Sequence, residues 1–189
     1  LTNLALAILK EPSFVKRVGL LAVVGGATHF PPGMEKGTIF VDYKSEYNLN
    51  CDPDAAMVVF ESGIPIRMSG LAPALQVTVG RKQLPRWRNS GKPAGRWIAA
   101  RVRERLDAHG SDETHLGDVL GCVLAVRPEL AQVRTLPLSL EMWGQTLRTV
   151  IDPTGSGRAV QVVLTVEPRK FMPVFLRAMD RALAASPGQ

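Results

Sequence analysis

The sequence predicts an α/β fold in which a mostly parallel sheet is flanked by helices. Leu20–Val24 is a continuous apolar run that ends at Gly25-Gly26, and such a run is typical of a buried parallel strand. Asp52-Pro53 opens a helix that continues to Gly63, because aspartate caps helix starts, proline suits the first turn and glycine ends helices. A second short strand follows at residues 64–68, and the order strand, helix, strand is the signature of an α/β protein.

The first part of the chain adds a helix and a long loop to this pattern. Residues 4–10 are a helix candidate with Asn3 as its N-cap. Residues 27–50 mix glycine, proline and charged residues with little periodicity, so we expect a long loop, of the kind that is often functional. After Pro93, apolar residues recur at helical spacing and predict a basic, amphipathic helix.

The second part of the chain completes the predicted sheet. A helix is expected to begin at Asp118, and alternating apolar residues predict a small antiparallel edge over residues 133–151. A strong strand at 160–166 and a closing helix at 168–183 follow. The length of 189 residues suits one domain or one large part of a domain.

The composition is that of an ordinary globular protein. Hydrophobic residues make up 46% of the chain and charged residues 21%, and no apolar run is long enough to span a membrane, so we expect a cytoplasmic protein. The formal charge is +6, but the arginines look spread over several surface segments, which does not favour nucleic acid as a partner. Cys51 and Cys122 are far apart and are expected to be free, partly buried thiols rather than a disulfide framework or a zinc site.

Two groups of polar residues are candidates for binding. Glu46 and Asn48 are two residues apart, so in extended backbone both side chains point the same way. A carboxylate beside an amide suits sugar hydroxyls, but on spacing alone a solvated loop with a helix cap behind it is the favoured explanation. Asp118 opens a helix. From the residue alone it is best explained as a plain N-cap. The alternative is one ligand of a hard cation such as Ca²⁺, which needs further oxygen ligands from other segments.

Other patterns carry weaker signals. The three histidines match no zinc motif, and His115 stands out only because it lies near Asp118 in the sequence. The glycine-rich segment 152–157 precedes a strand rather than a helix, which indicates a turn and not a phosphate loop. The basic segment 81–92 contains Trp87 and suggests either a nucleic-acid clamp or, as the favoured interpretation, a solvated helix face.

Several segments, in order along almost the whole chain, resemble motifs of the inosine-uridine preferring nucleoside hydrolase family. The most specific is the block of Ser45–Asn48 followed by Asp52–Ala56, which resembles the family's Ala-Glu-Phe-Asn and Asp-Pro-Glu-Ala-Ala motifs. The further matches are Leu1–Ala5, Val23–Ala27, Gly117–Leu120 and Thr149–Asp152.

The resemblance implies an enzyme that hydrolyses the N-glycosidic bond of ribonucleosides, in purine or pyrimidine salvage, and that works as a homo-oligomer. The family holds a Ca²⁺ at the carboxyl ends of a parallel sheet, where it binds the ribose hydroxyls and the attacking water. By the match, Asp118 would be a calcium ligand, and Glu46 and Asn48 would bind the ribose of the nucleoside substrate.

The chain also departs from the family pattern. The N-terminal aspartate cluster, which supplies most calcium ligands, has no counterpart, so we expect residues 1–189 to be the C-terminal part of a single nucleoside hydrolase domain, inactive alone. Gly117 stands where many members carry the histidine that protonates the leaving base, and no catalytic residue is assigned with certainty. His115 is a candidate substitute. Phe40 stands where the family has a ribose-binding asparagine.

Three hypotheses therefore remain open. The first is part of a calcium-dependent nucleoside hydrolase. The second is a non-catalytic binding or assembly protein that retains the fold, which Gly117 and Phe40 favour. The third is a basic nucleic-acid-binding domain, which would require salt-dependent binding. We rank them in this order.

Overall fold

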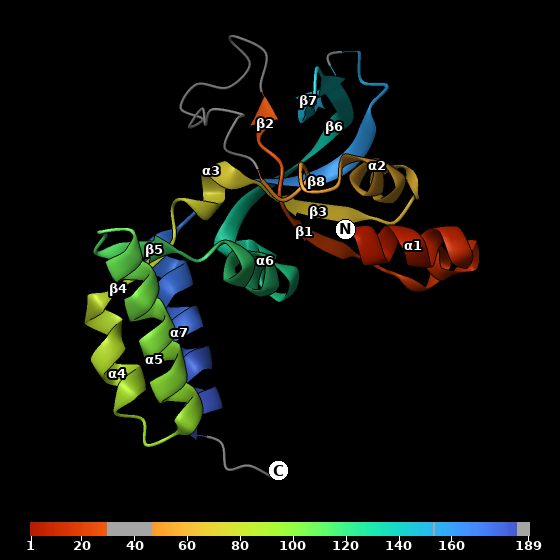
Figure 1. Cartoon of the computed structure of the whole chain (residues 1–189). Coiled ribbons are helices and arrows are strands. Elements are labelled where there is room, and N and C mark those ends of the chain that lie inside the picture. The colour runs from red at the N-terminus through yellow and green to blue at the C-terminus, as the bar shows by residue number, and fades with distance from the viewer. Residues whose placement is uncertain (30–46, 153, 185–189) are drawn as a thin grey trace. The chain divides into compact units, whose positions relative to one another are not determined.

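The structure, a computed structural model, describes residues 1–29, 47–152 and 154–184 and has the α/β fold that the sequence predicts (Figure 1). The chain forms two compact units. The sheet unit comprises residues 1–74 and 117–166, and the helical unit comprises residues 75–116 and 167–189.

The sheet unit is built on six strands in the order β1-β3-β8-β6-β7-β2. β1, β3 and β8 are parallel, as are β7 and β2, whereas β6 runs antiparallel to both β8 and β7. The β6–β7 pair confirms the antiparallel edge that was predicted over residues 133–151. The strands are β1 (Leu21–Val24), β2 (Thr28–His29), β3 (Ile66–Ser69), β6 (Ala131–Trp143), β7 (Thr146–Ile151) and β8 (Arg158–Val166).

Helices cover both faces of the parallel strands because side chains alternate along each strand. Ile66 and Met68 of β3 join Phe60 of α2 in one apolar core. The residue between them, Arg67, donates instead to the Leu124 carbonyl of α6 over 2.7 Å. The helical segments of this unit are α1 (Thr2–Lys10), η1 (Pro12–Arg17), α2 (Pro53–Glu61), α3 (Leu71–Ala74), α6 (Gly117–Val126) and η4 (Pro128–Leu130).

Helix starts show where local signals were sufficient and where they failed. Asp52 caps α2 as predicted, because its carboxylate accepts a hydrogen bond from the Ala55 backbone N–H over 3.1 Å. The predicted cap at Asn3 is wrong. The Ala5 N–H bonds to the Leu1 carbonyl over 3.0 Å, so α1 begins at Thr2 and Asn3 lies inside it.

The helical unit packs α4 (Leu84–Arg88), α5 (Pro93–Ala108) and α7 (Pro168–Ala184) beside η3 (Arg81–Gln83) and the antiparallel pair β4 (Thr78–Gly80) and β5 (Glu113–His115). Trp87 of α4 is buried, with its ring edge-on to Phe175 of α7 at a centroid distance of 6.4 Å. A Cβ at Gly95 would lie 2.4 Å from the Trp87 carbonyl oxygen, so only glycine lets α5 approach α4 this closely. Because Trp87 is buried, it offers no platform for stacking a base.

Other expectations need correction. Residues 109–117 contain no helical or alternating apolar pattern and were expected to form a loop, whereas His115 is the last residue of β5, paired with Thr78. Both cysteines are free and exposed rather than partly buried. None of the helices in the described part of the chain is long and apolar enough to cross a membrane.

Candidate functional site

The candidate site lies where β1 and β3 end side by side. The Gly25 N–H donates to the Ser69 carbonyl over 3.1 Å, and the Leu71 N–H donates to the Gly26 carbonyl over 2.9 Å. Gly26 has a φ of +82°, and a Cβ there would lie 2.9 Å from the Thr149 hydroxyl oxygen. Only glycine permits this backbone conformation and close approach. Because β1 and β3 pair in parallel, their carboxyl ends lie at one edge of the sheet, where open α/β sheets bind ligands.

Asn48 is fixed at this edge. Its side-chain N–H donates to the carbonyl of Val24, the last residue of β1, over 2.9 Å. The next residue, Leu49, is 2% exposed. The Asn50 amide then bonds twice to the backbone of Leu147 in β7, donating to its carbonyl over 3.1 Å and accepting from its N–H over 2.7 Å. Although Asn48 is itself exposed, its segment is anchored to two strands.

The start of α6 lies against the same strand end. A Cβ at Gly121 would lie 2.3 Å from a Val24 methyl carbon, and one at Gly117 would lie 3.9 Å from the other Val24 methyl. At the far end of α6, Arg67 caps the Leu124 carbonyl. The helix is therefore fixed along β1 and β3 with its first turn at Val24.

The structure thus brings the segment of Asn48 and the first turn of α6 into contact with the same residue, Val24. Asn48 bonds to Val24, and Gly117, which precedes Asp118, packs on Val24. Asp118 is exposed in the first turn of α6. Glu46 lies outside the described residues. The roles of these residues stay predictions.

The described residues do not by themselves make a calcium site. Ca²⁺ takes six to eight oxygen ligands. Within residues 1–29, 47–152 and 154–184, no three His, Cys, Asp or Glu side chains come together as a metal-binding group. Asp118 is therefore at most one ligand of a set that needs groups from elsewhere.

A cavity of about 500 Å³ lies at the opposite edge of the sheet, where β8 begins and α2 ends. Its lining includes Phe60, Glu61 and Arg158 but neither Asn48 nor Asp118. Burial lowers the pKa of Arg158, whose guanidinium donates to the Ile64 carbonyl. This arginine connects the end of α2 to β8, which is a structural role. The cavity is therefore not taken as the candidate site.

Gly121 is the positioning residue that the sequence analysis missed. A glycine inside an apolar helical pattern costs stability compared with alanine and often marks close packing. That signal was present in the sequence, but only the structure identifies Val24 as the neighbour that excludes a side chain.

Comparisons with known proteins point to one family. The sequence profile of the family described as inosine-uridine preferring nucleoside hydrolase matches residues 1–173. The pyrimidine-specific ribonucleoside hydrolase RihA of Citrobacter koseri is 25% identical over 181 residues, which cover 90% of this chain and 55% of that protein.

Solved structures agree with the sequence matches. The purine-preferring ribonucleoside hydrolase from Gardnerella vaginalis is 26% identical, with a TM-score of 0.79 over 98% of this chain and 59% of that one. A plant nucleoside hydrolase is 25% identical, with a TM-score of 0.73 over 98% and 59%. The chain thus spans somewhat more than half the length of these relatives.

Proposed function

Because the chain belongs to the inosine-uridine preferring nucleoside hydrolase family, we propose that it takes part in hydrolysing the N-glycosidic bond of ribonucleosides to ribose and a free nucleobase. The observation that carries the proposal is the attachment of both Asn48 and the first turn of α6 to Val24 at the carboxyl end of β1. Nucleoside hydrolases among its relatives differ in whether pyrimidine or purine nucleosides are named as substrates, so the base preference is left open.

Asn48 is suited to hold a ribose hydroxyl. One of its two N–H bonds is used by the Val24 carbonyl, which fixes the orientation of the amide. An amide has two N–H donors and an oxygen acceptor, so the group retains the capacity both to donate to and to accept from a hydroxyl. Glu46, two residues earlier, is proposed as its partner.

These contacts favour the transition state if they tighten as the reaction proceeds. Cleavage of a glycosidic bond passes through an oxocarbenium-like state in which the sugar gains positive charge. Carboxylate and amide oxygens that accept from the ribose hydroxyls then bind more strongly than in the ground state, and this difference is what accelerates a reaction. The carboxylate of Asp118 would act at the same edge.

We also propose that this chain is the C-terminal part of a single hydrolase domain. Calcium dependence then requires ligands outside the described residues, since Asp118 alone is insufficient. Gly117 supplies no side chain for protonating the leaving base, and His115, which is exposed on β5 of the helical unit, is kept only as a candidate. The absent side chain at position 117 also favours the alternative, a non-catalytic binding or assembly protein.

The test measures release of ribose from inosine and uridine. The proteins are the 189-residue chain and the product of the native reading frame that contains it, each with and without a chelator. In the active form, Asp118→Asn should lower kcat/KM by roughly 100-fold. Asp54→Asn is the matched control, because Asp54 is also an exposed aspartate in the first turn of a helix, and it should change kcat/KM less than about twofold.

Two results would count against the proposal. If Asp118→Asn and Asp54→Asn had the same kcat/KM, Asp118 would not be part of the site. A folded protein that is inactive with both nucleosides in every form, with calcium present, would favour the non-catalytic alternative.

A further inference from the structure

The positive charge of the chain is concentrated in one stretch of the helical unit. Residues 81–108 contain nine Lys or Arg and two Asp or Glu, a formal charge of +7, whereas the whole chain carries +6. All other residues together therefore carry −1. The arginines themselves are spread along the chain, as expected, but those outside this stretch are balanced by acidic residues. The excess charge therefore lies on η3, α4 and α5.

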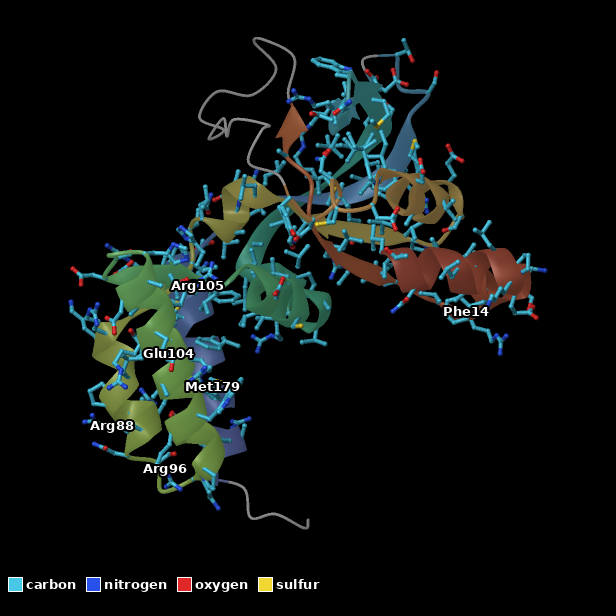
Figure 2. The ribbon with its side chains drawn as sticks, in the orientation of Figure 1. Phe14, Arg88, Arg96, Glu104, Arg105 and Met179 are labelled. Atoms are coloured by element: carbon cyan, nitrogen blue, oxygen red, sulfur yellow. The ribbon has the colours of Figure 1, made fainter. Side chains whose placement is uncertain are left out.

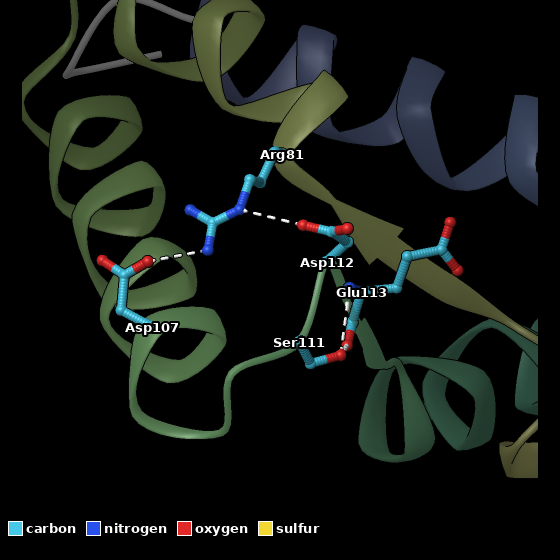
Figure 3. Close-up of polar contacts among 5 residues, drawn as sticks. All are labelled: Arg81, Asp107, Ser111, Asp112 and Glu113. Carbon is cyan, nitrogen blue, oxygen red and sulfur yellow. Dashed lines mark hydrogen bonds and ion pairs between the residues drawn. The ribbon is translucent and has the colours of Figure 1, made fainter.

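Several arginines of this stretch are tied to carboxylates. Arg81 pairs with Asp107 over 2.8 Å and with Asp112 over 3.3 Å (Figure 3). Arg101 pairs with Glu104. These bonds occupy both acidic residues of the stretch, Glu104 and Asp107. Arg86 in turn pairs with Asp180 of α7.

Three other arginines surround a hollow of about 210 Å³ between α4 and α5. Figure 2 labels Arg88 on α4 and Arg96 near the start of α5. Arg96 donates to the Gly91 carbonyl over 3.4 Å, and neither Arg88 nor Arg103 forms an ion pair with any residue that the structure describes. The residues that line the hollow are Leu84, Arg88, Arg96, Ala99, Ala100 and Arg103.

We propose that this hollow binds a phosphate group. Three exposed arginines line this one small space, and an anion bound between them would offset the repulsion of their like charges. The planar guanidinium matches phosphate with two parallel hydrogen bonds, and the apolar surface of Ala99 and Ala100 limits the water that competes for those bonds. The volume is below the 300–1,000 Å³ or so of pockets that enclose whole drug-sized ligands, so the hollow suits one group rather than a complete nucleotide.

The site is independent of the proposed hydrolase chemistry, since all of its lining residues belong to the helical unit. The phosphate could come from inorganic phosphate or from a small phosphomonoester such as a nucleoside 5′-monophosphate. A single-stranded nucleic acid is the competing source, because Trp87 of α4 is buried but Trp97 of α5 is 65% exposed and could stack on a base. The salt dependence of binding separates the two sources.

The experiment is calorimetric titration of the 189-residue chain with inorganic phosphate, with uridine 5′-monophosphate alone and in the presence of phosphate, and with a single-stranded oligonucleotide. Each titration is run at constant ionic strength, and the oligonucleotide titration is repeated at a second salt concentration. Arg96→Gln and Arg103→Gln should each weaken binding about tenfold, because each removes a charge-assisted hydrogen bond. Arg101→Gln is the matched control. It removes the same charge from the same helix, but from an arginine already paired with Glu104, and it should change the dissociation constant less than about twofold.

Each outcome decides something. If phosphate and uridine 5′-monophosphate compete for the same site, the proposal is supported and a phosphomonoester can supply the bound phosphate group. If only inorganic phosphate binds saturably, the proposal is also supported, with free phosphate as the ligand. An equal loss in Arg101→Gln would show a general charge effect and overturn the proposal. So would the absence of saturable binding, or binding only to an oligonucleotide with steep salt dependence. Circular dichroism of each variant verifies its fold.

Discussion

One methyl group added at Gly121 should push α6 away from β1, whereas the same group added at Gly117 should not. A Cβ at position 121 would lie 2.3 Å from a Val24 methyl carbon, while non-bonded carbons favour about 3.5–4.0 Å. The Val24 side chain has little freedom to turn aside because valine is stiff about χ1. At Gly117 the nearest atoms are 3.8 and 3.9 Å away, which is ordinary contact.

The two substitutions should therefore change stability in opposite directions. Alanine in place of glycine inside a helix gains up to about 1 kcal/mol, and overpacking costs about 1–3 kcal/mol. Since more than 1 Å of movement is needed at position 121, we take the upper part of that range and expect Gly121→Ala to lose about 1–2 kcal/mol. For a chain of this size that lowers Tm by about 2–8 °C. Gly117→Ala, at the helix start, should gain about 0.5 kcal/mol.

The assay is thermal and urea unfolding of the 189-residue chain, followed by circular dichroism. A double-mutant cycle then combines Val24→Ala with each of the two glycine variants. Removing the Val24 methyls should restore part of the lost stability to Gly121→Ala but not benefit Gly117→Ala, because only the first pair is in direct conflict. If Gly121→Ala proved as stable as Gly117→Ala, α6 would not lie against β1 at this distance, and the argument that places Asp118 at the strand end would fail with it.

Further predictions concern a hydrogen bond, a close helix contact and an ion pair within the two units. Arg67→Met should cost about 1–2 kcal/mol in urea unfolding, since it removes the hydrogen bond to the last turn of α6; an unchanged midpoint would contradict that role. Gly95→Ala should cost a similar amount, because its Cβ would meet the Trp87 carbonyl oxygen at 2.4 Å, and an increase in Tm would speak against the close α4–α5 packing. The hydrogen bond from Arg86 lowers the pKa of Asp180, so the pair stabilises the fold above the unfolded pKa of about 3.9 and this contribution is lost as the pH falls through the lower folded value. Melting curves of Asp180→Asn and the parent should therefore differ at pH 7 and converge towards pH 3, and a constant difference would refute the assignment.

Much of the fold could be predicted because its signals are local. The apolar run before Gly25-Gly26, the Asp52-Pro53 cap and the alternating residues of 133–151 each depend on a few neighbours in sequence, and each corresponds to an observed element. Asn3 failed as a cap because the competing start at Thr2 is decided by backbone bonding, not by side-chain preference.

The candidate site could be predicted only in its components. Motif resemblance singled out Asn48 and Asp118, but their attachment to one strand end depends on contacts between residues far apart in sequence, Val24 with Asn48 and Val24 with Gly121. Periodicity carries no information about such contacts, since it reports which face of an element is apolar and not what lies against that face.

The sequence by itself determined the family, the main strands and helices of the sheet unit, and the net charge. Only the tertiary structure decided that Trp87 is buried against Phe175, and that Arg101 is neutralised while Arg88 and Arg103 face a common hollow. The physical reason is that burial and ion pairing depend on distances of a few ångströms between separate elements, and those distances are set when the helices pack, not by the residues of any one segment.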